Sequence, residues 1–485
     1  MYKTIGKNAV LNIIKTISSI IFPLVTFPYA SRVLHVDNLG KVNYSSSIIS
    51  YFSLLASLGI SVYAIREGAG IRNDKRRFER FVSEVYSVNI VTTIISCFIL
   101  LLFILFDPYL HNYRAVLLIL SMLIPFTTFS VDWINSIFED YIYISIRTIV
   151  FQFIALLIII FFVKKKDDYC IYALSTVVSS VGAGVLNYFY TKKYCKRRFT
   201  LQFNIQKHLK PIMILFATSI ASVIYTSADT TMLGCMVGDY SVGLYSTAVK
   251  IYNIFKQVLF AIIVVSLPRL TFMYNNTSTE EYKSILMKVH DVLIILVFPI
   301  VIGLFMLSPE IIKILAGKEY AAAIPTLRIL SISILFCTFG YFYMQLVLLP
   351  LKAENNILIA TIISASVNII LNVYFIHKFK QNGCAFTTLL SELIVLLISM
   401  YCTLKNISIR INFKNIIQSF IGSILILIYI IFIKIEINQD ILVIIAAFTG
   451  SVIIYGFFLI LMKNDIIYDL LMKFRSKIHL IEKLS

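Results

Sequence analysis

The sequence predicts an all-α polytopic membrane protein with about 14 transmembrane helices, arranged as two six-helix lobes plus two C-terminal helices. Composition is the first reason: of 485 residues, 59% are hydrophobic and only 14% are charged, whereas a typical soluble domain has about 25% charged residues. The second reason is the pattern. Apolar stretches of about 20 residues, the length of a membrane-crossing helix, follow one another from Ala9 to Met462 with short polar hinges between them.

The predicted spans are the apolar stretches themselves, taken in chain order. Those of the first lobe are 9–30, 44–65, 83–106, 115–137, 146–163 and 169–190. Those of the second lobe are 211–233, 244–266, 285–307, 326–350, 356–376 and 384–404, and the C-terminal pair is 416–433 and 441–462. Because the first stretch lacks a small-residue cleavage site and more spans follow it at once, we expect it to be the first helix and not a removed signal peptide.

The most polar joint, Lys192 to Lys210, divides the first twelve spans into two sets of six. We therefore predict an N-lobe at 1–191, a basic cytoplasmic linker at 192–210, a C-lobe at 211–404, and the last two helices with a cytoplasmic tail at 405–485. A faint repeat supports two lobes: Leu39-Gly-Lys-Val-Asn-Tyr-Ser45 resembles Val242-Gly-Leu-Tyr-Ser246, and each opens the second helix of its lobe. Since six is even, the repeat is parallel, as in some transporters, and a cavity between the lobes is expected.

The positions of the basic residues predict the orientation. A net charge of +18 would suggest a nucleic-acid partner in a soluble chain, but in a membrane protein lysine and arginine accumulate on the cytoplasmic side. The two densest clusters, Arg66–Arg80 and Lys192–Lys210, lie on the same side as the N-terminus in this topology. Both termini are therefore expected in the cytoplasm, with anionic membrane lipids and not nucleic acid as neighbours.

Metal and redox chemistry find no support in the sequence. The seven cysteines form no Cys-x-x-Cys pair, and the six histidines neither pair at helical spacing nor join the cysteines. We expect the cysteines to be small buried side chains. No metal and no cofactor is predicted.

A polar stripe runs along one side of each of the first two spans. In the first span the side chains that share a narrow arc are Asn8, Asn12, Lys15, Ser19 and Thr26. Lys15 is compatible with a wet cavity or with a long stem that reaches the cytoplasmic interface. The serines on one face of the second span, Ser50 and Ser53 among them, either line a cavity or allow close helix packing.

The seventh and eighth spans, which open the second lobe, repeat this pattern. Span seven carries Thr218, Ser222, Tyr225 and Asp229, and one arc of span eight carries Ser246, Lys250, Asn253, Lys256 and Gln257. A lysine that faces lipid costs at least ~2.5–3.5 kcal/mol, so we expect the two lysines of span eight to face water or an anionic ligand. The four striped spans would then enclose a cationic cavity in which Lys15, Lys250 and Lys256 bind an anion, and hydroxyl and amide groups bind sugars.

A second group of charged residues is predicted to serve ion coupling or gating. These residues are Asp132, Asp229, Arg32, Arg269 and Arg328. A solvated helix end, or an ion pair inside one lobe, is the competing explanation for Asp132, Arg328 and Arg147. Asp229 could equally be an ordinary interfacial residue.

Several motifs resemble those of polysaccharide-repeat-unit flippases of the Wzx type. They are Phe22-Pro-Leu-Val-Thr-Phe-Pro-Tyr-Ala-Ser-Arg-Val-Leu34, Leu39 to Asn43, Tyr51-Phe52, Leu58-Gly59, Asp229 to Gly234, Val242 to Ala248, Pro268-Arg269, Asn368 to Asn372, Gly383 to Phe386 and Glu392. Their order across most of the chain is more specific than any one of them. One departure is His35, where the family usually has glycine, and this could alter the turn at that point.

The resemblance implies the fold of the multidrug/oligosaccharidyl-lipid/polysaccharide (MOP) exporters, which includes the MATE transporters. It implies alternating access that moves an undecaprenyl-diphosphate oligosaccharide from the cytoplasmic to the outer leaflet of the bacterial cytoplasmic membrane, for O-antigen or capsule. A polysaccharide polymerase and a chain-length regulator would be partners.

Three alternatives remain. A peptidoglycan-precursor flippase handles the same diphosphate, and a MATE-type multidrug exporter should carry more carboxylates in its cavity. A glycan polymerase or ligase would need catalytic groups on an outer loop, but the longest one, Ser308 to Pro325, has no paired acid/base or metal-binding arrangement. We therefore expect a transporter and not an enzyme.

Overall fold

The structure is a computed structural model that describes residues 2–200, 205–407 and 412–468, with the backbone alone described for most of residues 2–20 and for a few other positions. Within these residues every regular element is helical. The helices form two compact units, residues 1–246 and 247–485. The lobe boundaries that we placed at 192–210 and 405 stay predictions.

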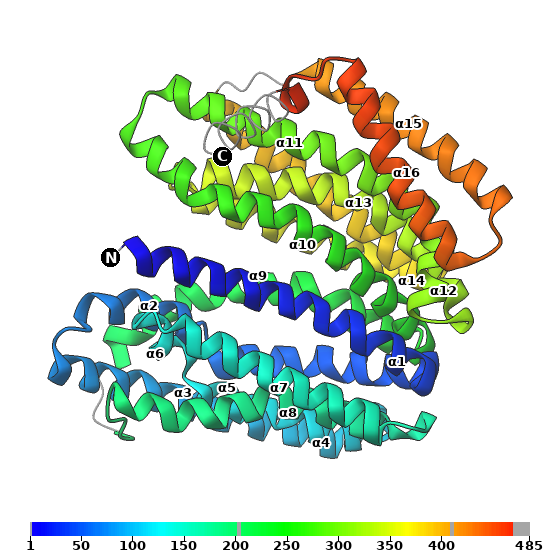
Figure 1. Cartoon of the computed structure of the whole chain (residues 1–485). Helices are drawn as coiled ribbons and strands as arrows, with labels where there is room; N and C mark the ends of the chain where they lie inside the picture. Colours follow the sequence, from blue (N-terminus) through cyan, green and yellow to red (C-terminus); the bar gives the residue numbers. More distant parts are fainter. Residues whose placement is uncertain (1, 201–204, 408–411, 469–485) are drawn as a thin grey trace, which may run out of the picture. The chain divides into compact units, whose positions relative to one another are not determined.

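Unit 1 contains the helices from α1 to α9 and the first residues of α10 (Figure 1). Their bounds are α1 Tyr2–Ser57, α2 Ile60–Ile71, α3 Lys75–Phe106, α4 Arg114–Ser121, α5 Leu123–Ser130, α6 Asp132–Ile137, α7 Tyr141–Phe162, α8 Tyr169–Tyr190, α9 Ile205–Met236 and α10 Asp239–Asn276. Short 3₁₀ helices lie at Pro108–Tyr113, Lys166–Asp168 and Thr191–Lys193. Helix α1 packs against α3, α7 and α9 and is the centre of this unit.

Unit 2 contains the rest of α10 and the remaining helices. Their bounds are α11 Thr279–Met306, α12 Ser308–Leu315, α13 Ile324–Tyr343, α14 Glu354–Asn406, α15 Phe413–Glu436 and α16 Asp440–Leu461, with a 3₁₀ helix at Lys318–Ala323 and a π-helix at Met344–Leu348. Helix α15 packs on α11 and on α16. Lys434 of α15 lies 2.8 Å from Glu310 of α12 and donates to the Met306 carbonyl oxygen of α11. Lys313 and Asp440 form a second ion pair, between α12 and α16.

The number of candidate membrane spans is close to the sequence prediction of about 14. Twelve helical stretches of the described chain are long and apolar enough to span a membrane. Two of them, Ile21–Ile71 and Glu354–Asn406, contain a residue with non-helical backbone angles, His35 and Lys380. Each of these two stretches is therefore kinked and longer than one membrane crossing needs, which brings the twelve stretches close to the predicted count.

The break in α1 at His35 has backbone angles that are typical of glycine. His35 has φ 61° and ψ 175°, a region that only glycine enters easily. His35 therefore adopts a backbone conformation that a glycine would adopt without strain. Strain of about 1–3 kcal/mol is expected at such a residue.

The two glycines of the predicted repeat meet inside unit 1. A Cβ atom on Gly40 would lie 1.9 Å from the Asp239 carbonyl oxygen, and one on Gly243 would lie 2.2 Å from the Val36 carbonyl oxygen. The backbone of α1 after its break and the start of α10 therefore touch directly. The repeat marks a close helix crossing that only glycine allows.

Candidate functional site

The polar arc predicted on the eighth span lies on α10. Ser246 is buried, Lys250, Asn253 and Lys256 are half-buried, and Gln257 is exposed. Ser246 belongs to unit 1 and the other four residues to unit 2. Because the stretch Asp239–Tyr274 is apolar enough to cross a membrane, α10 carries two partly covered ammonium groups inside a spanning helix.

Aromatic rings hold the side chain of Lys256. Its Nζ lies 5.0 Å from the centre of the Tyr252 ring and 5.6 Å from that of Phe260, and Phe260 stacks on Tyr341 of α13 at 4.0 Å. Such cation–π contacts contribute about 0.5–2 kcal/mol each. The rings position the ammonium group but carry no net charge, so they do not neutralise the charge of Lys256.

Glu392 of α14 is a buried carboxylate that our site prediction missed. It is 6% exposed, and its Oε1 lies 3.5 Å from the hydroxyl of Tyr252 on α10. Glu392 and Lys256 both lie within electrostatic range of the Cys337 thiol of α13. Ionisable residues inside spanning helices are functional candidates by default, and a single carboxylate within the apolar stretch 384–404 was the signal that could have identified it.

The serines of the second span contact α9. Ser50 donates to Ser227 at 3.0 Å, Thr231 donates to Ser47 at 2.9 Å, and the hydroxyls of Tyr51 and Thr231 lie 3.2 Å apart. In unit 1 these hydroxyl groups therefore bond to one another across the interface between α1 and α9. These hydrogen bonds are compatible with interhelical packing, and the predicted contact of Ser50 with substrate stays a prediction.

The other predicted lining residues fall into two groups. Asn12, Lys15 and Ser19 lie on α1, but their side chains lie outside the described part of the structure. Ser53 and Tyr225 are half-buried and Ser222 is exposed. Their predicted contact with substrate stays a prediction.

Two of the charged residues considered for coupling lie in polar clusters of unit 1. The Asp229 carboxylate is 6% exposed and accepts a hydrogen bond from the Tyr245 hydroxyl at 2.6 Å. Asp132 accepts from Arg147 at 2.8 Å and from the Asn187 side-chain amide at 2.9 Å. The Arg147 side chain is only 3% exposed, so Asp132 and Arg147 form an ion pair that joins α6 to α7.

The other three charged residues considered for gating are arginines, one in unit 1 and two in unit 2. Arg32 is exposed and donates to the Pro28 carbonyl oxygen at 2.7 Å. Arg269 is exposed near the end of α10, and the half-buried Arg328 lies 5.4 Å from the ring of Phe305. A role in gating stays a prediction for each of them.

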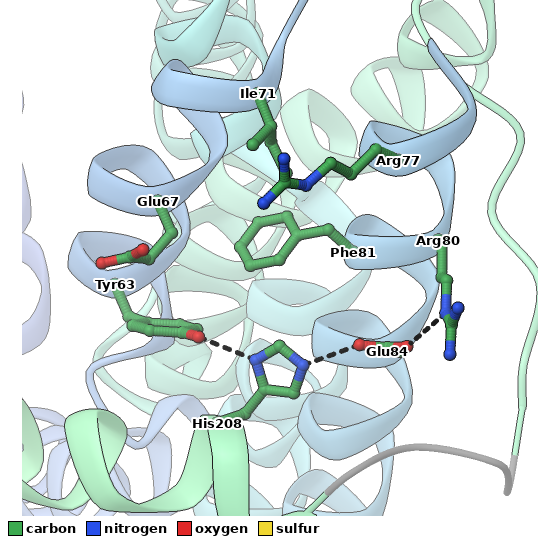
Figure 2. A pocket seen from close by; sticks show the side chains of 8 residues that line it. All are labelled: Tyr63, Glu67, Ile71, Arg77, Arg80, Phe81, Glu84 and His208. Carbon is green, nitrogen blue, oxygen red and sulfur yellow. Dashed lines mark hydrogen bonds and ion pairs between the residues drawn. The ribbon is translucent and has the colours of Figure 1, made fainter. Parts of the chain in front are cut away.

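Unit 1 also contains a polar pocket that the sequence did not reveal (Figure 2). The Nδ1 atom of His208 lies 2.7 Å from the Tyr63 hydroxyl, and its Nε2 lies 2.7 Å from Glu84 Oε2. Arg80 donates to the other oxygen of Glu84 at 3.0 Å. This chain of four side chains lines a cavity of about 380 Å³, together with Glu67, Ile71, Arg77 and Phe81.

A second polar cluster lies where α6 leads into α7. Asp140 accepts hydrogen bonds from the hydroxyls of Tyr190 at 2.6 Å and Tyr194 at 2.7 Å, and from Lys193 at 3.2 Å. Desolvation by burial opposes ionisation of Asp140, but these hydrogen bonds outweigh it and hold the pKa of Asp140 below its ordinary value. Nearby, burial raises the pKa of the Cys195 thiol to about 11. In the described residues, no three His, Cys, Asp or Glu side chains are grouped so that they could hold a metal ion.

Comparison with known protein families and curated sequences gives consistent matches. Residues 5–273, more than half of the chain, match a family described as "Polysaccharide biosynthesis protein". The chain is 24% identical to the capsular polysaccharide biosynthesis protein CapF of Staphylococcus aureus, covering 84% of this chain and 100% of that protein. It is 21% identical to the "Putative O-antigen transporter" of Shigella dysenteriae, covering 81% of this chain and 98% of that protein.

Solved structures show the same fold. A structure of the lipid II flippase MurJ in an inward closed conformation superposes with a TM-score of 0.79 at 16% identity, covering 95% of this chain and 100% of that one. An inward-facing MATE multidrug transporter of the MOP superfamily gives a TM-score of 0.62 at 14% identity, covering 83% of this chain and 98% of that one. The predicted MOP-type architecture is confirmed, and the named relatives include transporters, as expected.

Proposed function

Since this chain belongs to the polysaccharide biosynthesis protein family, we propose that it is a flippase that moves undecaprenyl-diphosphate-linked oligosaccharide repeat units from the cytoplasmic to the outer leaflet. The repeat units would then be available for the assembly of a surface polysaccharide. Relatives named for capsule biosynthesis and O-antigen transport match over nearly their whole length, which supports this substrate class. The fold supports a transporter, because it is shared with MurJ and with MATE transporters.

The observation that carries the proposal is the pair of half-buried lysines, Lys250 and Lys256, on a membrane-spanning stretch of α10. A diphosphate cannot cross hydrocarbon unaided, because the idealised cost of transferring one such charge is of order 20 kcal/mol. Ammonium groups in a hydrated path would lower that barrier through charge-assisted hydrogen bonds to phosphate oxygens. Hydroxyl and amide groups such as Asn253 and Gln257 suit the sugars, and the polyprenyl tail can stay in lipid.

The proposed orientation places both termini in the cytoplasm of a bacterium. In unit 1, α2, the start of α3 and the segment after α8 gather at one end (Figure 1), and these segments carry the basic clusters around Arg66–Arg80 and Lys192–Arg198. That end would be cytoplasmic under the positive-inside rule, next to anionic lipids. A polysaccharide polymerase and a chain-length regulator are the proposed protein partners at the outer leaflet.

The proposal is tested by replacing both lysines. The double variant Lys250→Ala/Lys256→Ala should flip a fluorescent undecaprenyl-diphosphate oligosaccharide in proteoliposomes more than tenfold more slowly, because each hydrogen bond to a charged group contributes about 1.5–3 kcal/mol. Lys288→Ala removes an exposed lysine of α11 and is the matched control that should keep the wild-type rate. An equal rate for all three proteins would contradict the proposed role of α10.

A peptidoglycan-precursor flippase is the second candidate, because the MurJ structure superposes over 95% of this chain. A deletion strain that carries the double lysine variant separates the two functions. Loss of surface glycan with normal growth supports the polysaccharide function, whereas cell lysis would assign the chain to peptidoglycan synthesis. A MATE-type exporter would instead confer drug resistance on a sensitive strain.

A further inference from the structure

The buried histidine of the pocket connects three helices that are distant in sequence. His208 lies near the start of α9 and is 1% exposed, Tyr63 of α2 is 3% exposed, and Glu84 of α3 is 7% exposed. Figure 2 shows the imidazole between the hydroxyl and the carboxylate, with both ring nitrogens in hydrogen bonds. This one side chain therefore holds the start of α9 to both α2 and α3.

The segment that precedes α9 is also bound to α3. The backbone N–H groups of Lys196, Arg198 and Thr200 donate to the side chains of Glu79, Ser83 and Ser87, at 3.1, 3.2 and 2.9 Å. The donors are two residues apart along the segment, and the acceptors are four residues apart along α3. These spacings match, because two extended residues advance about 6.6 Å and four helical residues advance about 6 Å. The segment is thus fixed to one side of α3, and His208 makes the next described contact along the chain.

We propose that His208 and Glu84 form a proton-binding site that controls how firmly α9 is held to α2 and α3. The site lies at the end of unit 1 that the proposed orientation places in the cytoplasm, and the pocket gives it access to water. Histidine is the side chain that changes charge between about pH 5 and 8, so it suits a site that responds to cytoplasmic pH. The inference concerns a conformational control and not the transported substrate.

The neutral site is already fully hydrogen-bonded. When the imidazole is neutral, its Nε2–H donates to Glu84 and its Nδ1 accepts from the Tyr63 hydroxyl, so every polar atom has a partner. An added proton goes to Nδ1, and the Tyr63 oxygen then accepts while its hydrogen turns toward the pocket. The contact with Glu84 at 2.7 Å, already a hydrogen bond to a carboxylate, then becomes an ion pair between imidazolium and carboxylate, which is stronger because both partners are charged.

The surrounding charges decide the direction of the effect. The charged residues that line the pocket are Glu84, Arg80 and Arg77 of α3 and Glu67 of α2. Glu67 forms an ion pair with Arg66 at 3.1 Å. Glu84 touches the imidazole directly, whereas Arg80 binds the far oxygen of that carboxylate. The side chains of Lys207 and Lys210 on α9 lie outside the described part. Because the nearest charge is negative, proton uptake should tighten the link between α3 and α9.

Hydrogen–deuterium exchange of the full-length protein in lipid nanodiscs tests the proposal. After correction for intrinsic exchange, amides of residues 205–215 in the wild-type protein should be about five- to tenfold better protected at about pH 6 than at about pH 8. His208→Gln and Glu84→Gln should abolish this difference, because each variant removes one partner of the ion pair. If one variant does not fold, the other still tests the proposal.

Arg198→Gln is the matched control. It removes an exposed positive charge from the segment before α9 but keeps the backbone N–H that donates to Ser83 and all the hydrogen bonds of His208. This variant should retain the wild-type pH response. A flat wild-type profile, a response that survives in His208→Gln, or a response that is lost in Arg198→Gln would each overturn the proposal.

Discussion

A residue that breaks a local rule of chain geometry is informative in this protein. His35 adopts φ 61° and ψ 175°, where a side chain is strained by about 1–3 kcal/mol. Gly40 and Gly243 show the opposite case, because any side chain there would overlap a backbone carbonyl group. All three residues lie where the two segments of α1 separate or where α1 meets α10. Single positions thus set the geometry of the most central helix of unit 1.

Replacing His35 by glycine should stabilise the protein. The variant removes the strain of about 1–3 kcal/mol and costs about 0.5–1 kcal/mol in backbone entropy, so the free energy of unfolding should rise by about 1 kcal/mol. His35→Val should lower it, since a β-branched residue is excluded from this conformation. Thermal unfolding of the purified variants in detergent measures both effects. A glycine variant that is less stable than wild type would show that contacts of the imidazole outweigh the strain.

Adding one methyl group at Gly243 should destabilise unit 1. The new Cβ would lie 2.2 Å from the Val36 carbonyl oxygen, and backbone cannot move aside as a flexible side chain can. We expect Gly243→Ala to lower the free energy of unfolding by about 1–3 kcal/mol. Gly303→Ala in α11 is the control, because its Cβ would meet nothing within 4 Å, and the alanine should be neutral or stabilising. Equal stabilities would mean that the two helices separate easily.

At the scale of whole elements, apolar length predicted the spans but not the polar helix ends. The span predicted at 169–190 has the same bounds as α8, Tyr169–Tyr190. This end-to-end agreement arises because charged or polar residues flank the apolar stretch directly on both sides. Helix α3 instead begins at Lys75 and not at residue 83, because Asp74 caps it by accepting from the Arg77 N–H at 3.1 Å. Hydropathy does not predict polar helical turns of this kind, and such turns line the pocket around His208.

Some of the candidate site residues could be predicted from the sequence and others could not. The arc of Lys250, Asn253 and Lys256 could be read from helical spacing because it lies on one helix. The contacts of His208 join it to Tyr63, 145 residues away, and to Glu84, 124 residues away. No periodic pattern connects residues on three helices, so only the fold could reveal that cluster.

The cluster around Asp140 should make the α6–α7 corner sensitive to acid. Hydrogen bonds from Tyr190, Tyr194 and Lys193 hold the pKa of Asp140 below its ordinary value despite burial. The stability contributed by the carboxylate is therefore present above the pKa of aspartate in an unfolded chain, about 3.9, and is lost as the pH falls through the lower folded value. Asp140→Asn should be about 1–3 kcal/mol less stable at neutral pH.

Unfolding measured between about pH 7 and about pH 3 checks this assignment. The stability difference between wild type and Asp140→Asn should shrink as the pH approaches the lower limit. Asp465→Asn is the control, because its carboxylate is 68% exposed in a long contact of 3.5 Å with Lys414, and exposed pairs of this kind contribute little. A constant difference between wild type and Asp140→Asn across the range would show that the carboxylate is not what the corner depends on.

For the whole molecule, the electrical work of transport follows from the charge that moves. The lysines proposed to bind the diphosphate are part of the protein, and if no counterion travels with the substrate, two negative charges leave the cytoplasm. An inside-negative potential then favours export by about 4.6 kcal/mol per 100 mV. Flipping in proteoliposomes should therefore accelerate when a potassium diffusion potential makes the lumen corresponding to the cytoplasm negative, and it should slow when the potential is reversed. The Lys288→Ala control should respond as wild type does. A rate that does not depend on the imposed potential would mean that another ion compensates the charge of the substrate. Coupling to a cation through Asp229 or Asp132 would then be tested with the variants Asp229→Asn and Asp132→Asn.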